Sequence, residues 1–195
     1  MKEHVSLAPL TTLGVGGKVR FFIEAHTEED IEDALAFARQ HTLPLFTLGE
    51  GSNVLVPDAG VEGVVLKNGM RDIAFEDSGE SVVLVAGAGA LWDAVVDAAG
   101  ARTIFGIENL AGIPGSLGGA VVQNIGAYGA ELANVFEYAD VIDTTTGESK
   151  RITLSDAAFA YRTSFFKEHR TCVIVRVALR LVQSAVPNIS YPDLA

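Results

Sequence analysis

Glycine is concentrated in three segments of this 195-residue chain, and these segments limit most strongly what it can fold into. They read LGVGG at residues 13–17, LGEGSNVL at residues 48–55 and GIPGSLGGA at residues 112–120. The third continues to QNIGAYG at residues 123–129, within a stretch from 106 to 129 that shows no periodic pattern. Long loops without a period are uncommon in compact domains and usually functional, so the second and third segments together predict a ligand site. The first segment alone is more typical of a turn.

Glycine-rich loops of this kind are suited to a diphosphate ligand. Glycine lets backbone N–H groups approach a ligand closely and adopt positive φ, and successive exposed N–H groups form anion-binding nests. Ser52, Asn53 and Ser116 add hydroxyl and amide hydrogen-bonding groups. Because these donors are neutral, they can bind phosphate even in a chain whose formal charge is −11.

The common nucleotide-binding fingerprints do not fit these segments. Val54 stands at the place of the third glycine of a GxGxxG pattern, and Trp92 stands there after residues 87–89. A P-loop ending at residues 17–18 would need a glycine where Thr12 stands. The sequence therefore excludes both a Rossmann domain and a P-loop nucleoside triphosphatase.

The composition is that of a globular protein, with 49% hydrophobic and 20% charged residues. The acidic balance argues against nucleic-acid binding and against docking on anionic membranes. No apolar run reaches the ~20 residues of a membrane helix, and no signal-type stretch follows Met1, so a cytoplasmic location is expected.

No metal site is predicted. The single cysteine, Cys172, lies in an apolar run without an activating base and is interpreted as a buried thiol.

The first third of the chain predicts a βαβ unit. Residues 18–25 are rich in β-formers, and Thr27 can cap a helix with apolar positions 31, 34, 35 and 38. Residues 43–48 follow as a second apolar strand, so the two strands are expected to form a parallel pair.

The rest of the chain is expected to be richer in β-structure. Strands are predicted at residues 63–66, 73–76, 81–86 and 173–181. The second and third of these flank a hairpin turn, and the last alternates between one buried and one wetter face. Residues 91–99 are expected to form a helix with Leu91, Val95 and Ala98 on one side. The fold class is therefore α+β.

Three segments resemble one protein family, the UDP-N-acetylenolpyruvoylglucosamine reductases. Residues 49–55 resemble the family's first FAD diphosphate loop, and residues 106–129 resemble its second FAD-binding stretch. Residues 159–167, FAYRTSFFK, are similar to its Y-R-x-S-x-F-K active-site segment. The order and spacing agree along nearly the whole chain, and the three segments together are highly specific.

The resemblance implies the FAD-binding fold shared with PCMH-type and vanillyl-alcohol-type oxidases, built from two α/β subdomains. A first, βαβ subdomain is expected at residues 1–67 and a second FAD-binding subdomain at residues 68–183. Residues 184–195 are expected to be a linker toward a further, C-terminal substrate domain. The family's proton-donating serine and a supporting glutamate lie in that domain and have no matching position in this sequence.

The resemblance also implies the cofactor-binding residues, one by one. They are Gly49, Glu50, Gly51, Ser52, Asn53, Val54, Gly112, Ile113, Pro114, Gly115, Ser116, Gly118, Asn124, Ile125, Gly126 and Ala127.

The implied reaction belongs to peptidoglycan biosynthesis. NADPH reduces FAD, and the reduced flavin passes hydride to the enolpyruvyl double bond of UDP-N-acetylglucosamine enolpyruvate, giving UDP-N-acetylmuramate. Arg162 is the candidate catalytic residue, because hydride addition beside a carboxylate builds negative charge that a guanidinium can clamp. A guanidinium is not deprotonated in proteins, so its role is electrostatic.

Three tyrosine and lysine positions are candidate contacts to the UDP-sugar substrate. Tyr161 is expected to contact substrate or to pack in the core, and Lys167 to meet a phosphate or to be solvated. Tyr191 resembles a substrate-closing tyrosine of one family subtype, although Pro192 replaces the usual glycine. An inert FAD-binding module and an FAD-dependent oxidase of the same fold remain as alternatives, and the segment around Arg162 favours the reductase.

Overall fold

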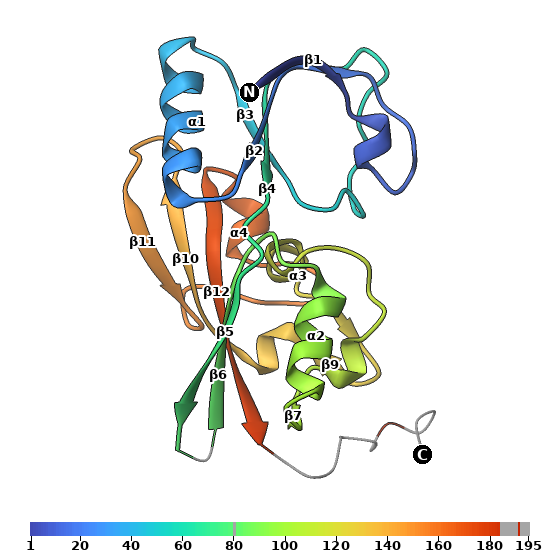
Figure 1. Cartoon of the computed structure of the whole chain (residues 1–195), viewed down its shortest axis with the longest axis vertical. Coiled ribbons are helices and arrows are strands. Elements are labelled where there is room, and N and C mark those ends of the chain that lie inside the picture. Colours follow the sequence, from blue (N-terminus) through green and yellow to red (C-terminus); the bar gives the residue numbers. More distant parts are fainter. Residues whose placement is uncertain (80, 184–190, 192–195) are drawn as a thin grey trace.

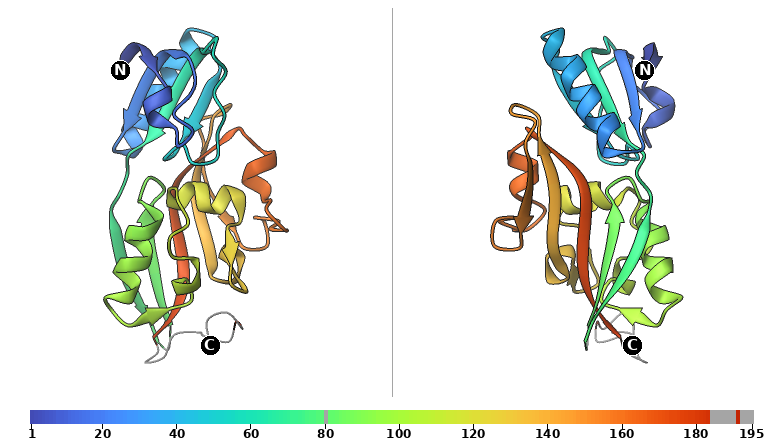
Figure 2. Two further views of the ribbon diagram at one scale, coloured as in Figure 1. Left: turned by 90° about the vertical axis from the view of Figure 1, so that its right-hand side faces the viewer. Right: turned by 60° about the vertical axis from the view of Figure 1, so that its left-hand side comes forward.

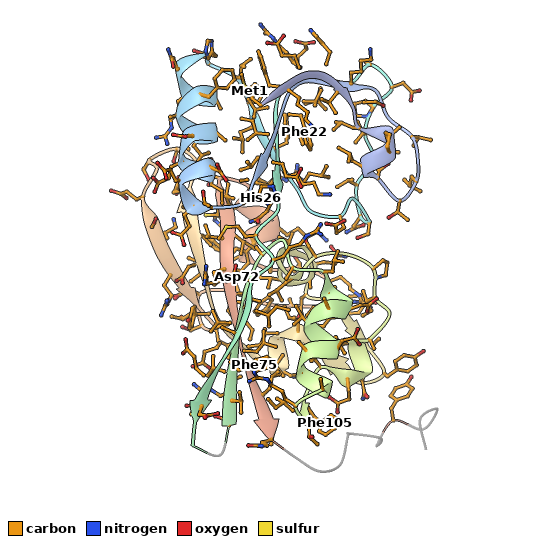
Figure 3. All side chains as sticks on the ribbon, viewed as in Figure 1. Met1, Phe22, His26, Asp72, Phe75 and Phe105 are labelled. Carbon is orange, nitrogen blue, oxygen red and sulfur yellow. The ribbon has the colours of Figure 1, made fainter. Side chains whose placement is uncertain are left out.

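The computed structural model describes residues 1–79, 81–183 and 191. Its two larger β-sheets meet near the middle of the molecule (Figure 1). The first sheet has the order β1-β2-β4-β3 and the second the order β11-β10-β12-β6-β5, with β7 also paired to β12. Figure 3 shows His26 and Asp72 at the level where the two sheets meet.

The first sheet contains the expected βαβ unit with one difference in strand order. Its elements are β1 Lys2–Ser6, β2 Lys18–Ala25, α1 Glu28–Gln40, β3 Leu45–Leu48 and β4 Val61–Asn68. Strands β2 and β3 are parallel, but each pairs with β4 between them rather than with the other. The reason is burial: β4 carries Val64, Val65 and Leu66 inside, whereas the middle of β3 is exposed. A strand that is apolar on both faces takes a central place in a parallel sheet.

Helix α1 begins where the sequence predicts. The Thr27 hydroxyl accepts a hydrogen bond from the Asp30 N–H, and the Asp30 carboxylate accepts from the Thr27 N–H, which completes a capping box. Residues Ile31, Ala34 and Leu35 are buried. They share a core cluster with Val173 and Val175 of the second sheet, so the helix links the two sheets.

The second sheet is entirely antiparallel. Its strands are β5 Ile73–Ser78, β6 Ser81–Gly87, β7 Ile104–Phe105, β10 Phe136–Asp143, β11 Ser149–Thr153 and β12 Cys172–Gln183. Strands β5 and β6 form the predicted hairpin. Strand β12 follows the predicted alternation only in part. Arg176 is half-buried and Arg180 is exposed, as the sequence predicts, but Ile174 and Ala178 are buried because each packs in a core cluster.

Helices and short turns cover one face of this sheet (Figure 2). They include α2 Trp92–Gly100, α3 Leu117–Gln123, α4 Phe165–Glu168, the short hairpin of β8 Gly126–Ala127 and β9 Ala130–Glu131, and 3-10 turns at Glu108–Leu110 and Leu132–Asn134. A further 3-10 turn lies at Ala8–Leu10 in the first part of the chain. Among the described residues, no helix is long and apolar enough to cross a membrane.

Helix α2 forms where expected but with a different buried face. Leu91 lies outside the helix and is 40% exposed, whereas Trp92, Val95 and Ala99 are buried. The Trp92 indole N–H donates a 2.7 Å hydrogen bond to the Leu110 carbonyl. The expected face was right at Val95 and wrong at Leu91. It omitted Trp92, the largest apolar side chain of the helix, which is buried where its indole N–H also finds an acceptor.

This contact leads to a stability prediction for Trp92→Phe. The variant is expected to lose about 2–4 kcal/mol of unfolding free energy, because it leaves a buried carbonyl without its partner and a small void. Leu91→Ala, at the neighbouring exposed position, is expected to cost less than about 1 kcal/mol. Urea unfolding of both variants measures this difference, and similar losses at the two positions would contradict the assigned helix face.

Helix α3 lies inside the glycine-rich stretch that shows no period in the sequence. The Ser116 hydroxyl caps it by accepting from the Gly119 N–H, and Leu117 and Val121 are buried. Gly118 has low helix propensity, but a Cβ at this position would lie 3.0 Å from the Cβ of Ala88. Close packing against β6 and its following turn therefore overrides propensity, and the helix was missed for that reason.

Candidate functional site

A cavity of about 430 Å³ lies between the loop after β3 and helix α3. Residues 47–54 line it from the first sheet, and residues 113–116 and 118–120 line it from the second part of the chain. The start of β12, at Val173 and Ile174, forms a further part of the wall. The size and position, between two packed units, are typical of a small-molecule site.

The two glycine-rich loops touch each other at this cavity. A Cβ on Gly49 would lie 2.5 Å from the Ser116 hydroxyl oxygen, and one on Gly115 would lie 3.1 Å from the Ser52 hydroxyl oxygen. Gly115 also has a φ of +140°, which other residues rarely adopt. The turns around Ser52 and Ser116, which lie far apart in the sequence, are therefore brought together.

Backbone N–H groups at this cavity are available to a ligand. Within the described ranges, no N–H of residues 49–54 donates a hydrogen bond to the protein, and neither do those of Ile113, Gly115 and Ser116. The first N–H groups of α3 differ, because Leu117 and Gly118 donate to carbonyls of the turn after β6. Polar backbone groups in a partly buried wall normally find partners, so these loops form a cradle of donors suited to a phosphate-bearing ligand.

A second cavity, of about 220 Å³, adjoins the first at Arg162, which lines both. The Arg162 Nη2 donates a 2.7 Å hydrogen bond to the Gly126 carbonyl. In the part of the chain that the structure describes, no carboxylate lies within 4.0 Å of its guanidinium. A half-buried cation without an ion pair can bind an anionic group of a ligand.

Arg162 sits in a tight turn with an unusual backbone. Ala160 and Thr163 exchange two N–H···O=C hydrogen bonds of 3.1 Å, and Arg162 between them has a φ of +56°. A non-glycine residue in this region costs about 1–3 kcal/mol and persists only when its surroundings hold it. Such strain occurs preferentially at functional sites.

The Arg162 segment is fastened to the C-terminal end of α3. The Ser164 hydroxyl donates to the Val122 carbonyl at 2.8 Å, and the Lys167 ammonium donates to the Gln123 side chain at 3.2 Å. Gln123 also accepts a 3.2 Å hydrogen bond from Asn53, in the loop after β3. The three sequence segments singled out above therefore meet in one site.

A sequence-profile comparison matches residues 19–153, more than half of the chain, to the family described as FAD binding domain. The chain belongs to the FAD-binding domain family. Its α+β fold is confirmed as the FAD-binding fold that it shares with PCMH-type oxidases.

Individual relatives carry more specific names. The UDP-N-acetylenolpyruvoylglucosamine reductase of Pseudomonas syringae pv. syringae (strain B728a) is 40% identical over 98% of this chain and 57% of its own length. The crystal structure of the reductase from Thermus caldophilus superimposes with a TM-score of 0.76 at 31% identity, over 92% of this chain and 61% of that one. Cholesterol oxidase from Brevibacterium sterolicum, at 20% identity and a TM-score of 0.67 over 85% and 34% of the two chains, shares the fold. The chain thus spans little more than half the length of the reductases it matches.

Most residues expected to bind FAD line the first cavity. They are Gly49, Glu50, Gly51, Ser52, Asn53, Val54, Ile113, Pro114, Gly115, Ser116, Gly118 and Ile125. Asn124, Gly126 and Ala127 line the second cavity instead. Gly112 is not among the lining residues of either, and its N–H donates to Asp93 at 2.8 Å. The cavity and its unpaired N–H groups fit the diphosphate of an FAD cofactor, although contact by each single residue stays a prediction.

The three expected substrate contacts lie in different places. Tyr161 is 83% exposed and lines the second cavity, so it does not pack in the core. Lys167 is exposed and also donates to the Arg162 carbonyl at 2.8 Å. Tyr191 makes an edge-to-face contact with Tyr128, with ring centroids 5.7 Å apart. Apart from Tyr191, the expected linker at residues 184–195 lies outside the described residues.

Several lining residues were missed by sequence reasoning. Gln123 belongs to the QNIGAYG motif and could have been predicted as a lining residue, whereas Asn68, Trp92 and Ile174 lie in segments without a glycine-rich motif. Cys172 is buried as expected and also lines the cavity, where burial raises the pKa of its thiol. Glu50 is engaged with two cations, Lys67 at 3.6 Å and Arg71 at 3.1 Å.

Proposed function

We propose that this chain is the flavin-binding part of a UDP-N-acetylenolpyruvoylglucosamine reductase. In this activity NADPH reduces FAD, and UDP-N-acetylglucosamine enolpyruvate is reduced to UDP-N-acetylmuramate, a step of peptidoglycan synthesis in the cytoplasm. The observation that carries the proposal is the Arg162 guanidinium, which lines both cavities and forms no ion pair within the described ranges.

The two loops would hold the cofactor. The N–H groups of residues 49–54 and of Gly115 and Ser116 would bind the diphosphate, and the Ser52 hydroxyl would add a further hydrogen bond. When bound, the flavin supplies a hydride to the substrate double bond. The shared position of Arg162 would then put its guanidinium between the cofactor cavity and the second cavity, which would take the enolpyruvyl group.

Arg162 would stabilise charge on the substrate. Hydride addition next to the enolpyruvyl carboxylate builds enolate-like charge on its oxygens, and two guanidinium N–H groups can clamp a carboxylate in parallel. The Gly126 carbonyl orients the guanidinium from one side. Tyr161, whose ring centroid lies 5.6 Å from the guanidinium carbon, would border the sugar nucleotide, with Lys167 and Tyr191 as further candidate contacts.

The boundaries of the two subdomains, 1–67 and 68–183, are also part of this proposal. We further propose that turnover needs the part of the reductases that this chain does not match, since the relatives are longer. An FAD-dependent oxidase activity has only a fold-level likeness in its support.

The test of this proposal begins with the purified chain and FAD. We expect a yellow protein that keeps about one flavin per chain after gel filtration. We also expect NADPH-dependent reduction of the enolpyruvyl sugar nucleotide to be low unless the unmatched part of a relative is supplied in trans. A chain that stays colourless after saturation with FAD would contradict cofactor binding. If the complemented protein binds flavin but does not reduce the enolpyruvyl sugar nucleotide, the chain would instead be an inert FAD-binding module.

A further inference from the structure

The side chain of Asn124 joins three segments beside Arg162. Its Nδ2 donates to the Ala160 carbonyl at 3.0 Å and to the Glu131 carboxylate at 3.1 Å, and its Oδ1 accepts from the Ala133 N–H at 3.0 Å. The residue is only 2% exposed. Both N–H groups and one lone pair of the amide are therefore used within the protein, which leaves little capacity for a ligand.

The Ala160 carbonyl accepts two hydrogen bonds that hold the Arg162 turn. It already accepts from the Thr163 N–H, so the Asn124 amide is a second donor to the same oxygen. The positive φ of Arg162 makes this turn strained, and external hydrogen bonds offset such strain.

The other end of Arg162 is fixed at the same place. Its guanidinium donates to the Gly126 carbonyl, two residues after Asn124. A Cβ on Gly126 would lie 3.7 Å from the Arg162 Nη1, so the backbone here runs alongside the guanidinium. The backbone turn and the charged head of Arg162 are thus both attached to one short segment, residues 124–126.

We propose that Asn124 is a positioning residue that holds the Arg162 turn so that the guanidinium faces the cavities, rather than a residue that contacts FAD. This inference rests on the proposed function and adds a role for the buried amide. It predicts that losing the amide weakens binding of the substrate carboxylate while FAD affinity stays unchanged.

The informative variant is Asn124→Gly. Asn124 has a φ of +44°, which glycine adopts without cost, so this substitution removes the side chain and keeps the backbone. The matched control is Asn134→Ala. The Asn134 side chain accepts a 2.9 Å hydrogen bond from the Glu131 N–H in the same loop, but among the described residues it forms no hydrogen bond with Ala160.

The first measurement is amide hydrogen exchange in the 195-residue chain, which does not need flavin. We expect the Thr163 amide to exchange about tenfold faster in Asn124→Gly, because a buried hydrogen bond contributes roughly this factor. The Leu179 amide in β12 serves as an internal reference for global stability. Exchange at Thr163 that is unchanged relative to this reference, or that is equally fast in Asn134→Ala, would overturn the inference.

The second measurement is a double-mutant cycle in the FAD-loaded protein complemented with the unmatched part of a relative. We expect Asn124→Gly to weaken binding of the enolpyruvyl sugar nucleotide about tenfold, with an unchanged dissociation constant for FAD. In an Arg162→Ala background the same substitution should have no further effect. Equal effects in both backgrounds would overturn the inference alone. If Arg162→Ala leaves both nucleotide binding and kcat unchanged, the proposed function fails, whereas the Thr163 exchange still decides whether Asn124 holds the turn.

Discussion

Arg162→Ala is expected to lower kcat for reduction of the enolpyruvyl sugar nucleotide about 10²–10³-fold in the complemented protein, with FAD affinity changed less than about twofold. The large factor follows because the guanidinium forms no ion pair within the described residues and lines both cavities, so its charge is available to the transition state. Alanine has the same difficulty with a φ of +56° as arginine, so the backbone strain is matched. Stopped-flow reduction and flavin titration measure the two quantities.

The control for this substitution is Arg170→Ala, an exposed arginine in the following segment. It should leave kcat within about twofold, because Arg170 is not among the residues that line the two cavities and an exposed charge is screened by salt. Arg162→Lys should recover only part of the loss, since a lysine cannot bind a carboxylate through two parallel N–H groups. Equal losses of kcat and FAD affinity in Arg162→Ala would make the residue structural.

Gly51→Ala is expected to lower the free energy of unfolding by about 3–5 kcal/mol and to abolish FAD binding. A Cβ at this position would lie 2.0 Å from the Leu10 carbonyl oxygen and 2.8 Å from the Thr11 Cα. Both are backbone atoms, and the Thr12 N–H donates to the Gly51 carbonyl at 3.0 Å. Moving the loop at residues 10–12 away from Gly51 would therefore break this hydrogen bond. Gly51 also has a φ of +70°.

The matched control is Gly14→Ala, in the facing loop. Gly14 has nearly the same φ, +67°, but no heavy atom of the described residues would lie within 4 Å of an added Cβ. It should therefore cost only the conformational part, about 1–2 kcal/mol. Urea unfolding of the two variants without flavin separates the conformational cost from the clash. Equal costs at the two positions would mean that the loop can move and that close packing does not define the cradle.

Part of the candidate site could be predicted from the sequence. The glycine loops, the YRTSFFK segment and the exclusion of a Rossmann domain follow from residue types at fixed spacing, and the family comparison confirms the cofactor class and the fold. The role proposed for Asn124 was not accessible in this way. Its motif predicts cofactor contact, and only the placement of Ala160 beside it points to the Arg162 turn.

Some helices and strands could likewise be predicted from the sequence, and others could not. The sequence by itself determined the strand at Lys18–Ala25, the helix that Thr27 caps and the hairpin of β5 and β6, because these depend on hydrogen bonds and periodicity within a few residues. Only the tertiary structure decided the central place of β4, the burial of Ile174 and Ala178 in β12 and the helix at Leu117–Gln123. Those outcomes depend on which distant surfaces pack together, such as Gly118 against Ala88, and local residue preferences do not contain that information.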